Sequence, residues 1–201
     1  MHAIRWIMVV LLLAPLAAAP ARAQTPTWYS FTWQPGVPLS NTKEFTNEFA
    51  WRGVGFDIKR AIKPNVAVGL SLGWQVFTQQ TDQVVSAFGL DISGDQFRYI
   101  NSFPILANVS YFFGKEGGAR PYVTANVGTY VMEHQLDIGL YSIHETNWHF
   151  GFAPEAGIAF PLRPNLAGVL NGRYNYALAA GSTNDQSYVT FGVGLAWTHG
   201  Y

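Results

Sequence analysis

The chain ends in the stretch SYVTFGVGLAWTHGY, residues Ser187 to Tyr201. Every second position is apolar, and the positions between are mostly small or polar; the apolar residues are Val189, Phe191, Val193, Leu195 and Trp197. In an extended strand, successive side chains point to opposite faces, so this stretch has one apolar face. An alternating strand with an aromatic end is typical of a β-barrel that crosses a membrane, with lipid on one face and the interior on the other.

The start of the chain predicts a cleaved secretory signal. Arg5 precedes the apolar run Trp6 to Leu13, and a small-residue stretch ending in Ala21-Arg22-Ala23 precedes Gln24. A transmembrane helix needs about 20 apolar residues, so this run is too short to be an anchor. We expect residues 1–23 to be a signal peptide and residues 24–201 to form the mature barrel.

Composition agrees with membrane strands. The chain is 49% hydrophobic and 12% charged, but after the signal no apolar run has the length of a membrane helix. The apolar residues are instead spread by alternation, as in outer-membrane strands. Cysteine is absent, so disulfides do not stabilise the fold. Without Arg5 and Arg22 the formal charge becomes −2, and nothing indicates nucleic acid as a partner.

Turn residues divide the mature chain into eight candidate strands, at about 28–34, 47–60, 66–79, 97–113, 120–133, 146–160, 166–178 and 187–201. Their connections alternate in length: short at 63–65, 114–119 and 162–165, and longer at 35–46, 80–96, 134–145 and 179–186. Membrane barrels have short periplasmic turns and long external loops, whereas a soluble sandwich has no reason to sort its loops this way. We therefore predict an all-β fold, an eight-stranded antiparallel up-and-down transmembrane β-barrel.

Side-chain parity assigns faces to the strands. In the third strand it places Val66, Val68, Leu70, Leu72, Trp74 and Val76 toward lipid, with Ala67, Gly69, Ser71, Gly73 and Gln75 inside. The same rule sends four charged residues into the lumen: Asp57, Lys59, Glu155 and Arg173. Side chains nearly fill an eight-stranded barrel, so we expect these two acids and two bases to neutralise each other and plug it. The alternative is a gate or charge ring lining a water path.

A specific ion pair follows from folding the seventh strand back about Arg163. This register places Glu155 opposite Asn171 and one diagonal step from Arg173, within reach of a long side chain. We therefore predict a Glu155–Arg173 ion pair in the lumen.

The chain resembles the small OmpA/OmpX-type, opacity-like outer-membrane barrels of Gram-negative bacteria. The signal, the eight strands, the stretches Ile105 to Phe113 and Arg120-Pro121-Tyr122-Val123, and the aromatic terminus carry the likeness; His199 replaces the expected penultimate aromatic. The resemblance implies outer-membrane residence among lipids and insertion by the barrel-assembly machinery. That machinery is implied to read the carboxyl-terminal strand, with Val193, Leu195, Trp197 and Tyr201 as its expected contacts, although lipid packing explains the same residues.

An enzymatic role is not expected. PagL-type lipid A deacylases have a similar strand pattern and carry a nucleophilic Ser and its His two residues apart near a strand end. The comparable stretch here, Arg173 to Gly181, has neither, and Ser142 and His144 occur in reversed order in a loop. Without an activated nucleophile, we assign no catalytic residue and no cofactor.

Two external loops remain as candidate sites. His134 and His144 lie on opposite limbs of the third long loop and could converge, but the spacing is not that of a metal site, and we assign no metal. The second long loop carries an apolar set, Val84, Val85, Phe88, Leu90 and Ile92. It is either a hairpin above the membrane or an interaction surface. We expect a monomeric barrel with a structural or surface-interaction role and an unidentified ligand; the alternatives are a narrow porin-like channel and, less favoured, a lipid-modifying enzyme.

Overall fold

Almost the whole described chain forms β-strands, in keeping with the alternation of apolar and polar residues along it. The computed structural model describes residues 26–87, 90–115, 117–138, 141–181 and 183–199. The predicted signal peptide and Tyr201 lie outside these residues. The elements, in chain order, are β1 (Thr27–Trp33), β2 (Gly36–Leu39), α2 (Ser40–Phe45), β3 (Arg52–Lys63), β4 (Val66–Ala87), β5 (Leu90–Phe112), β6 (Arg120–Ile138), β7 (Tyr141–Arg163), β8 (Leu166–Ala177) and β9 (Gln186–His199).

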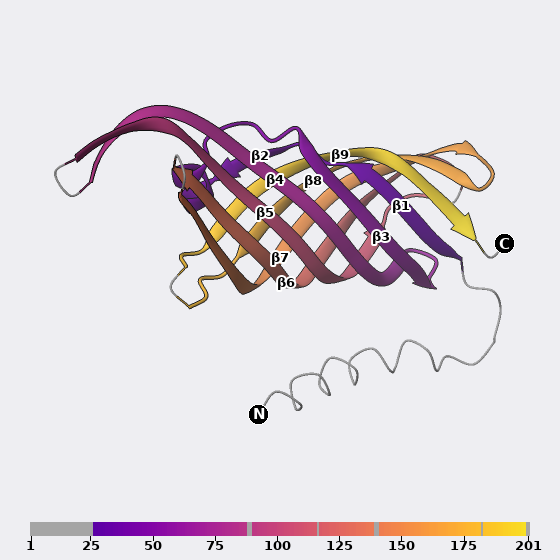
Figure 1. Cartoon of the computed structure of the whole chain (residues 1–201). Helices are drawn as coiled ribbons and strands as arrows, with labels where there is room; N and C mark the ends of the chain where they lie inside the picture. Colours follow the sequence, from indigo (N-terminus) through magenta and orange to yellow (C-terminus); the bar gives the residue numbers. More distant parts are fainter. Residues whose placement is uncertain (1–25, 88–89, 116, 139–140, 182, 200–201) are drawn as a thin grey trace.

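The strands close into a ring (Figure 1). From β3 to β9 each strand pairs antiparallel with the next, and β1 pairs with β3 on one side and with β9 on the other, Thr27 lying opposite His199. Past Pro35, β2 continues β1 along β9, with Gly36 opposite Thr190. The nine strands of the described residues therefore form a ring of eight, and the predicted antiparallel barrel is confirmed.

One end of the barrel carries the short turns. The start of β1, the end of β9 and the turns β3–β4, β5–β6 and β7–β8 gather there, on the right in Figure 1. Gly114 and Gly117 in the β5–β6 turn have φ near +80°, a conformation that glycine adopts without strain. In outer-membrane barrels the end with short turns is periplasmic, so the opposite end is extracellular.

The extracellular connections differ from the prediction. Residues 80–96 and 134–145 were expected as loops, but they prolong the strands as paired hairpins that reach Ala87 opposite Leu90 and Ile138 opposite Tyr141. Backbone pairing continues beyond the lipid because the ladder hydrogen bonds do not require an apolar face. The β4–β5 hairpin extends well past the other strands (Figure 1).

The first connection was also predicted wrongly. Residues 35–46 were expected as a loop and residues 47–60 as a strand. The chain instead forms β2 and the short helix α2, and β3 begins only at Arg52. Pro35 has no N–H for a ladder, so the first strand is interrupted there before it resumes as β2.

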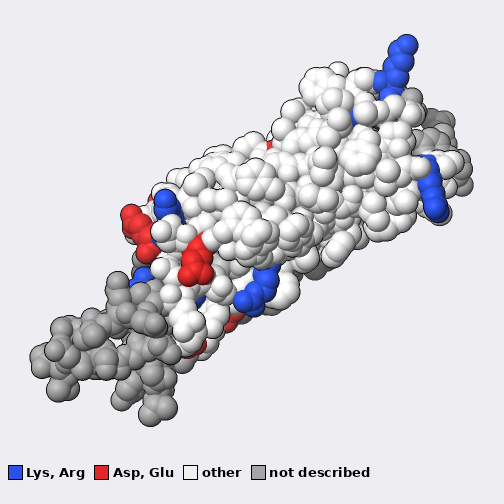
Figure 2. All heavy atoms as spheres, turned by 90° about the horizontal axis from the view of Figure 1, so that it is seen from above, with Lys and Arg blue, Asp and Glu red and all other residues white. Residues whose placement is uncertain are grey.

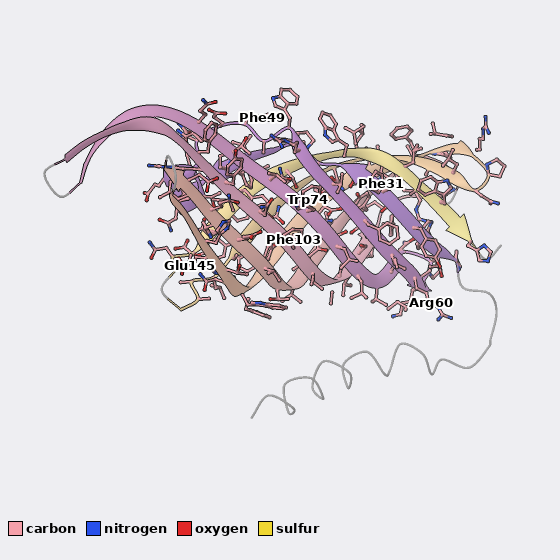
Figure 3. The ribbon with its side chains drawn as sticks, viewed as in Figure 1. Phe31, Phe49, Arg60, Trp74, Phe103 and Glu145 are labelled. Atoms are coloured by element: carbon pink, nitrogen blue, oxygen red, sulfur yellow. The ribbon has the colours of Figure 1, made fainter. Side chains whose placement is uncertain are left out.

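The outer wall carries a broad band without charged side chains. Figure 2 shows this band between charged groups at the two ends of the molecule. Exposed aromatic residues flank it, with Trp33, Trp74, Phe103 and Trp148 on the extracellular side and Tyr29, Tyr111, Phe113 and Trp197 on the periplasmic side. Trp74 and Phe103 stack with ring centroids 6.3 Å apart on neighbouring strands, while Glu145 and Arg60 lie toward opposite ends (Figure 3). Such girdles mark the two membrane–water interfaces.

The predicted side-chain faces are largely confirmed. Leu72, Trp74, Val193 and Trp197 are exposed on the outer wall, and Ala67, Ser71 and Gln75 are buried inside. Val76 departs from the expectation: it lies opposite Arg52 and Asn101 and is only 7% exposed. No helix among the described residues has both the length and the apolar character needed to cross a membrane.

Candidate functional site: the sealed lumen

The middle of the lumen holds the four charged residues that parity predicts to face inward. Arg173 on β8 lies between two acids: its Nε and Nη2 are 2.6 and 2.5 Å from Glu155 Oε2, and Nη2 is 3.2 Å from Asp57 Oδ1. Lys59 Nζ is 3.9 Å from Glu155 Oε1. Each of these side chains is at most 8% exposed. Two carboxylates and two cations thus form a formally neutral buried network.

Neutral side chains complete this charge network. Ser30 and Ser71 donate hydrogen bonds to Asp57, and the Asn171 amide donates to Glu155 Oε1 at 3.2 Å. Asn108 Nδ2 donates to Ser71 at 2.9 Å. Buried charges are tolerated when they are both paired and hydrogen-bonded, so these polar groups stabilise the charges where they lie. The parity argument identified the four charged residues but did not single out these partners, which the same alternation also sends inside.

The register between β7 and β8 differs from the prediction. Glu155 lies directly opposite Arg173, and Asn171 lies opposite Gly157. The prediction was two residues off because it folded the chain about Arg163, whereas the turn is centred between Pro164 and Asn165, with Arg163 opposite Leu166. The pairing then shifts by one residue between Pro161 and Arg163. In the observed register Glu155 and Arg173 are directly opposite and not one diagonal step apart.

Inward glycines make room for this network. A Cβ on Gly157 would lie 2.6 Å from the Tyr122 ring, and one on Gly192 would clash with the Asn171 amide. These strand positions therefore need glycine because a polar side chain from the neighbouring strand lies over the backbone.

Above the charge network, toward the cell exterior, the lumen is filled by an apolar core. Its members include Phe77, Ile100, Tyr130, Met132 and Tyr188, all at most 2% exposed. Tyr188 and Ser102 share a hydrogen bond of 3.0 Å, and the Tyr130 hydroxyl donates to Asn175 at 3.2 Å. Two aromatic hydroxyls are thereby satisfied inside the core.

Helix α2 covers this core at the extracellular mouth. The Thr42 hydroxyl donates to Gln186 Oε1 at 2.8 Å and accepts from the Ser187 N–H at 3.1 Å. Asn41 donates to the Asp185 backbone oxygen at 2.9 Å. Phe45 packs against the apolar core. The helix is too short to be stable alone, so these contacts to β9 and the core hold it in place.

Phe45 also contacts His134, whose position on β6 is beyond the aromatic girdle. The two rings meet edge to face, with centroids 5.4 Å apart, and the Arg98 guanidinium carbon lies over the Phe45 ring, 5.6 Å from its centroid. Burial lowers the pKa of His134, nearby His149 lowers it further, and Glu145 opposes the shift. His134 is therefore neutral at pH 7, which suits its packing against an apolar ring.

The two loop histidines do not converge. His134 lies opposite Glu145, while His144 lies opposite Gln135 and is exposed. Adjacent residues in a strand point to opposite faces, so the two imidazoles are on different sides of the wall. Across the described residues no three His, Cys, Asp or Glu side chains gather in a way that could hold a metal ion.

The other predicted site residues fall into two groups. Val193, Leu195 and Trp197 are exposed on the outer wall of β9, and Tyr201 lies outside the described residues. Of the apolar set in the second external loop, Phe88 lies outside the described residues. The backbone of the other four belongs to the β4–β5 hairpin, with Val85 opposite Ile92. The side chains of Val84, Val85, Leu90 and Ile92 lie outside the part of the chain that the structure describes.

Below the charge network, the periplasmic end of the lumen contains a cavity of about 460 Å³. Inward residues of β1, β5, β6, β8 and β9 form its apolar wall, chiefly Trp28, Phe112, Tyr122, Val169 and Ala196. The lumen thus has three layers: a capped apolar core, a neutral charge network, and an open chamber toward the periplasm.

A closed eight-stranded barrel with an apolar, aromatic-flanked outer wall and a buried charge network in its lumen is a transmembrane barrel of the outer membrane. The family model described as outer membrane protein beta-barrel domain matches residues 8–198, and the chain belongs to this family. Its location is the cell outer membrane. Among curated proteins, none matches the chain by sequence.

Solved structures share the fold at low sequence identity. Pseudomonas aeruginosa OprG has a TM-score of 0.60 and 11% identity, covering 90% of this chain and 98% of its own. Neisserial surface protein A has a TM-score of 0.53 and 12% identity, covering 87% and 97%. Ail, the attachment invasion locus protein of Yersinia pestis, solved with the heparin analogue sucrose octasulfate, has a TM-score of 0.53 and 11% identity, covering 88% and 99%.

Proposed function

We propose that this protein is a non-enzymatic structural and surface-interaction barrel whose lumen does not conduct. The observation that carries the proposal is the double closure of the lumen, by the Asp57–Lys59–Glu155–Arg173 charge network and by α2 above it. With its interior filled, the barrel presents its extracellular hairpins as the parts able to meet other molecules. The presence of a surface protein and an attachment protein among its structural neighbours supports this role.

We assign the proposed surface role to the external hairpins and not to the outer wall of the barrel. The β4–β5 hairpin reaches farthest from the barrel, and its sequence carries the apolar set Val84, Val85, Phe88, Leu90 and Ile92 (Figure 1). We propose that an unidentified surface ligand binds there, and that the barrel acts as a monomer. The other proposed partners are the outer-membrane lipids and, during biogenesis, the barrel-assembly machinery. We propose that this machinery reads Val193, Leu195, Trp197 and Tyr201.

The competing function is a narrow channel for small solutes. It is favoured by the 460 Å³ chamber, which opens the lumen from the periplasm up to Lys59 and leaves the charge network and the capped core as the barrier. A channel would need this barrier to open, whereas the structural role needs it to remain closed.

Single-channel recording separates the two functions. The mature chain is refolded, its folded fraction is established by a heat-dependent gel shift, and currents are recorded across a planar bilayer. We expect no steady conductance from the native protein, and leak events only when Glu155→Ala or Arg173→Ala disrupts the network. Glu48→Ala, at an exposed residue outside the lumen, is the matched control. Steady conductance of the native barrel would refute the sealed-lumen role and establish the channel.

A further inference from the structure

The periplasmic chamber has a chemistry distinct from the rest of the lumen. Its wall is the second apolar cluster of the barrel, in which the Trp28 and Phe112 rings lie 5.3 Å apart and the Phe112 and Tyr122 rings 5.4 Å apart. The charge network closes it above at Lys59, so the chamber ends blindly inside the barrel. Its volume lies within the range of about 300–1,000 Å³ that small-molecule pockets occupy.

Cations accompany this apolar wall. Lys59, Arg120 and Arg163 line the chamber, and no carboxylate is among the described residues that do. Lys59 Nζ lies 4.9 Å from the centre of the Tyr122 ring, and the Arg120 guanidinium lies 5.0 Å from that of Phe112. Arg163 is exposed at the rim, in the strand end before the β7–β8 turn. Lys59 belongs to the neutral network above, so among the described lining residues Arg120 and Arg163 bring positive charge to the lower part of the chamber.

Arg120 is held toward the rim by the periplasmic turns. Its Nη2 donates to the Pro64 backbone oxygen at 3.0 Å and to Asn65 Oδ1 at 3.3 Å. These contacts fix the guanidinium beside the β3–β4 turn, while Arg163 comes from the β7–β8 side. Two arginines at the opening and three aromatic rings on the wall form a site for a ligand with an anionic head and an apolar body.

We propose that the periplasmic chamber binds one free medium-chain fatty acid anion. Its alkyl chain lies against Trp28, Phe112 and Tyr122, and its carboxylate faces Arg120 and Arg163 at the opening. Burial of each methylene group against an apolar wall is favourable, so an alkyl chain gains affinity there where a sugar or nucleotide would not. Arginine pairs well with carboxylates, which selects an acid over a neutral amphiphile. The blind upper end favours a single chain over a two-chain phospholipid.

Trp28 serves as the reporter of binding, because it lines the chamber whereas most other tryptophans face lipid. The folded barrel in nanodiscs is titrated with dodecanoate brominated at its terminal carbon, and fluorescence quenching is recorded. Subtracting the quenching measured for Trp28→Phe from that of the native protein isolates the Trp28 signal, because the tryptophans on the outer wall are quenched equally in both. We expect this difference to saturate at one equivalent of the acid.

Two matched comparisons test the site. Ala167→Phe fills the chamber and should weaken binding at least about tenfold, whereas Ala125→Phe, on the exposed outer wall, should leave it unchanged. The equally brominated alcohol should bind several-fold more weakly than the acid, and Arg163→Gln should reduce that preference. The gel shift verifies that each variant is folded. Trp28 quenching that never saturates, or that Ala167→Phe leaves unaltered, would overturn the chamber as a binding site; equal affinity for the alcohol would overturn the anionic ligand.

Discussion

Arg173 is the residue on which the charge network depends. Its guanidinium contacts both Glu155 and Asp57, and the nearest other cation, Lys59, is 3.9 Å from Glu155. Removing one member of a buried ion pair leaves the other charge without compensation, which costs far more than a surface pair contributes.

Arg173→Met should therefore lower the free energy of unfolding by about 3–5 kcal/mol, because two carboxylates would remain buried. Guanidinium titration of the barrel in lipid vesicles measures this change. Lys63→Met, at an exposed residue near the periplasmic turn, should change it by less than about 0.5 kcal/mol. A similar small loss for both variants would show that the network does not stabilise the fold.

Gly192 and Gly172 form a matched pair for testing the crowding of the lumen. A Cβ at Gly192 meets the Asn171 amide, while one at Gly172 meets no atom within 4 Å. Gly192→Ala should cost about 1–3 kcal/mol, since overpacking displaces the amide that donates to Glu155. Gly172→Ala should be neutral or slightly stabilising, because it reduces the freedom of the unfolded chain. The same titration compares them, and equal effects would contradict the packing argument.

At the scale of the elements, helix α2 is held in place mainly by its contacts to neighbouring elements. Its hydrogen bonds run to Asp185, Gln186 and Ser187 before and at the start of β9, and Phe45 packs beside His134. Glu145 and His149 act on the His134 imidazole from β7, and Arg98 on β5 lies over the Phe45 ring that His134 contacts. Charging the imidazole beside Phe45 and Arg98 should weaken the cap.

The pH dependence of the cap follows from the direction of the His134 pKa. Burial lowers the pKa of His134 below 6.5, so the unfolded or detached state binds a proton more readily than the packed state. The stability from His134 is therefore fully present above pH 6.5 and is lost as pH falls through the lowered pKa. Protection of the Ser187 amide against hydrogen exchange, corrected for intrinsic rates, should decline over that acidic range in native protein and much less in His134→Gln. A parallel decline in both would exclude His134 as the cause.

For the molecule as a whole, the decisive feature is the uncharged outer band between two aromatic girdles (Figure 2). Val127 on β6 lies near the middle of this band, opposite Ala107, and is 48% exposed, whereas exposed Ile62 is next to the β3–β4 turn.

An arginine should be tolerated differently at these two positions. Val127→Arg should destabilise the barrel by about 2–4 kcal/mol in vesicles, and Ile62→Arg by about 0–1 kcal/mol, because the cost of a charge falls from the midplane to the interface. Reversible guanidinium unfolding in vesicles gives both values. If the two substitutions cost the same, the band is not the part of the wall that meets the hydrocarbon core.

The sequence alone determined the fold class, the inward and outward faces and the identity of the four lumen charges. Each of these depends on a period of two along a strand, so a local pattern is sufficient. It identified Asp57, Lys59, Glu155 and Arg173. It also placed the strand starts at Val66, Arg120 and Leu166 correctly, but it ended the extracellular hairpins too early.

The tertiary structure decided what depends on pairing between distant segments. The register that places Glu155 opposite Arg173 comes from the turn at Pro164 and Asn165 and from a one-residue shift between Pro161 and Arg163. The external hairpins continue because their partner strands are aligned beside them. Helix α2 closes the mouth because Thr42 meets Gln186 and Ser187, more than a hundred residues along the chain. The periplasmic chamber likewise forms where Trp28 of β1 meets Phe112 of β5 across the closed ring, beside the β5–β6 pair Phe112 and Tyr122. Such contacts between remote segments leave no periodic signal in the sequence, because they arise from the geometry of the closed barrel.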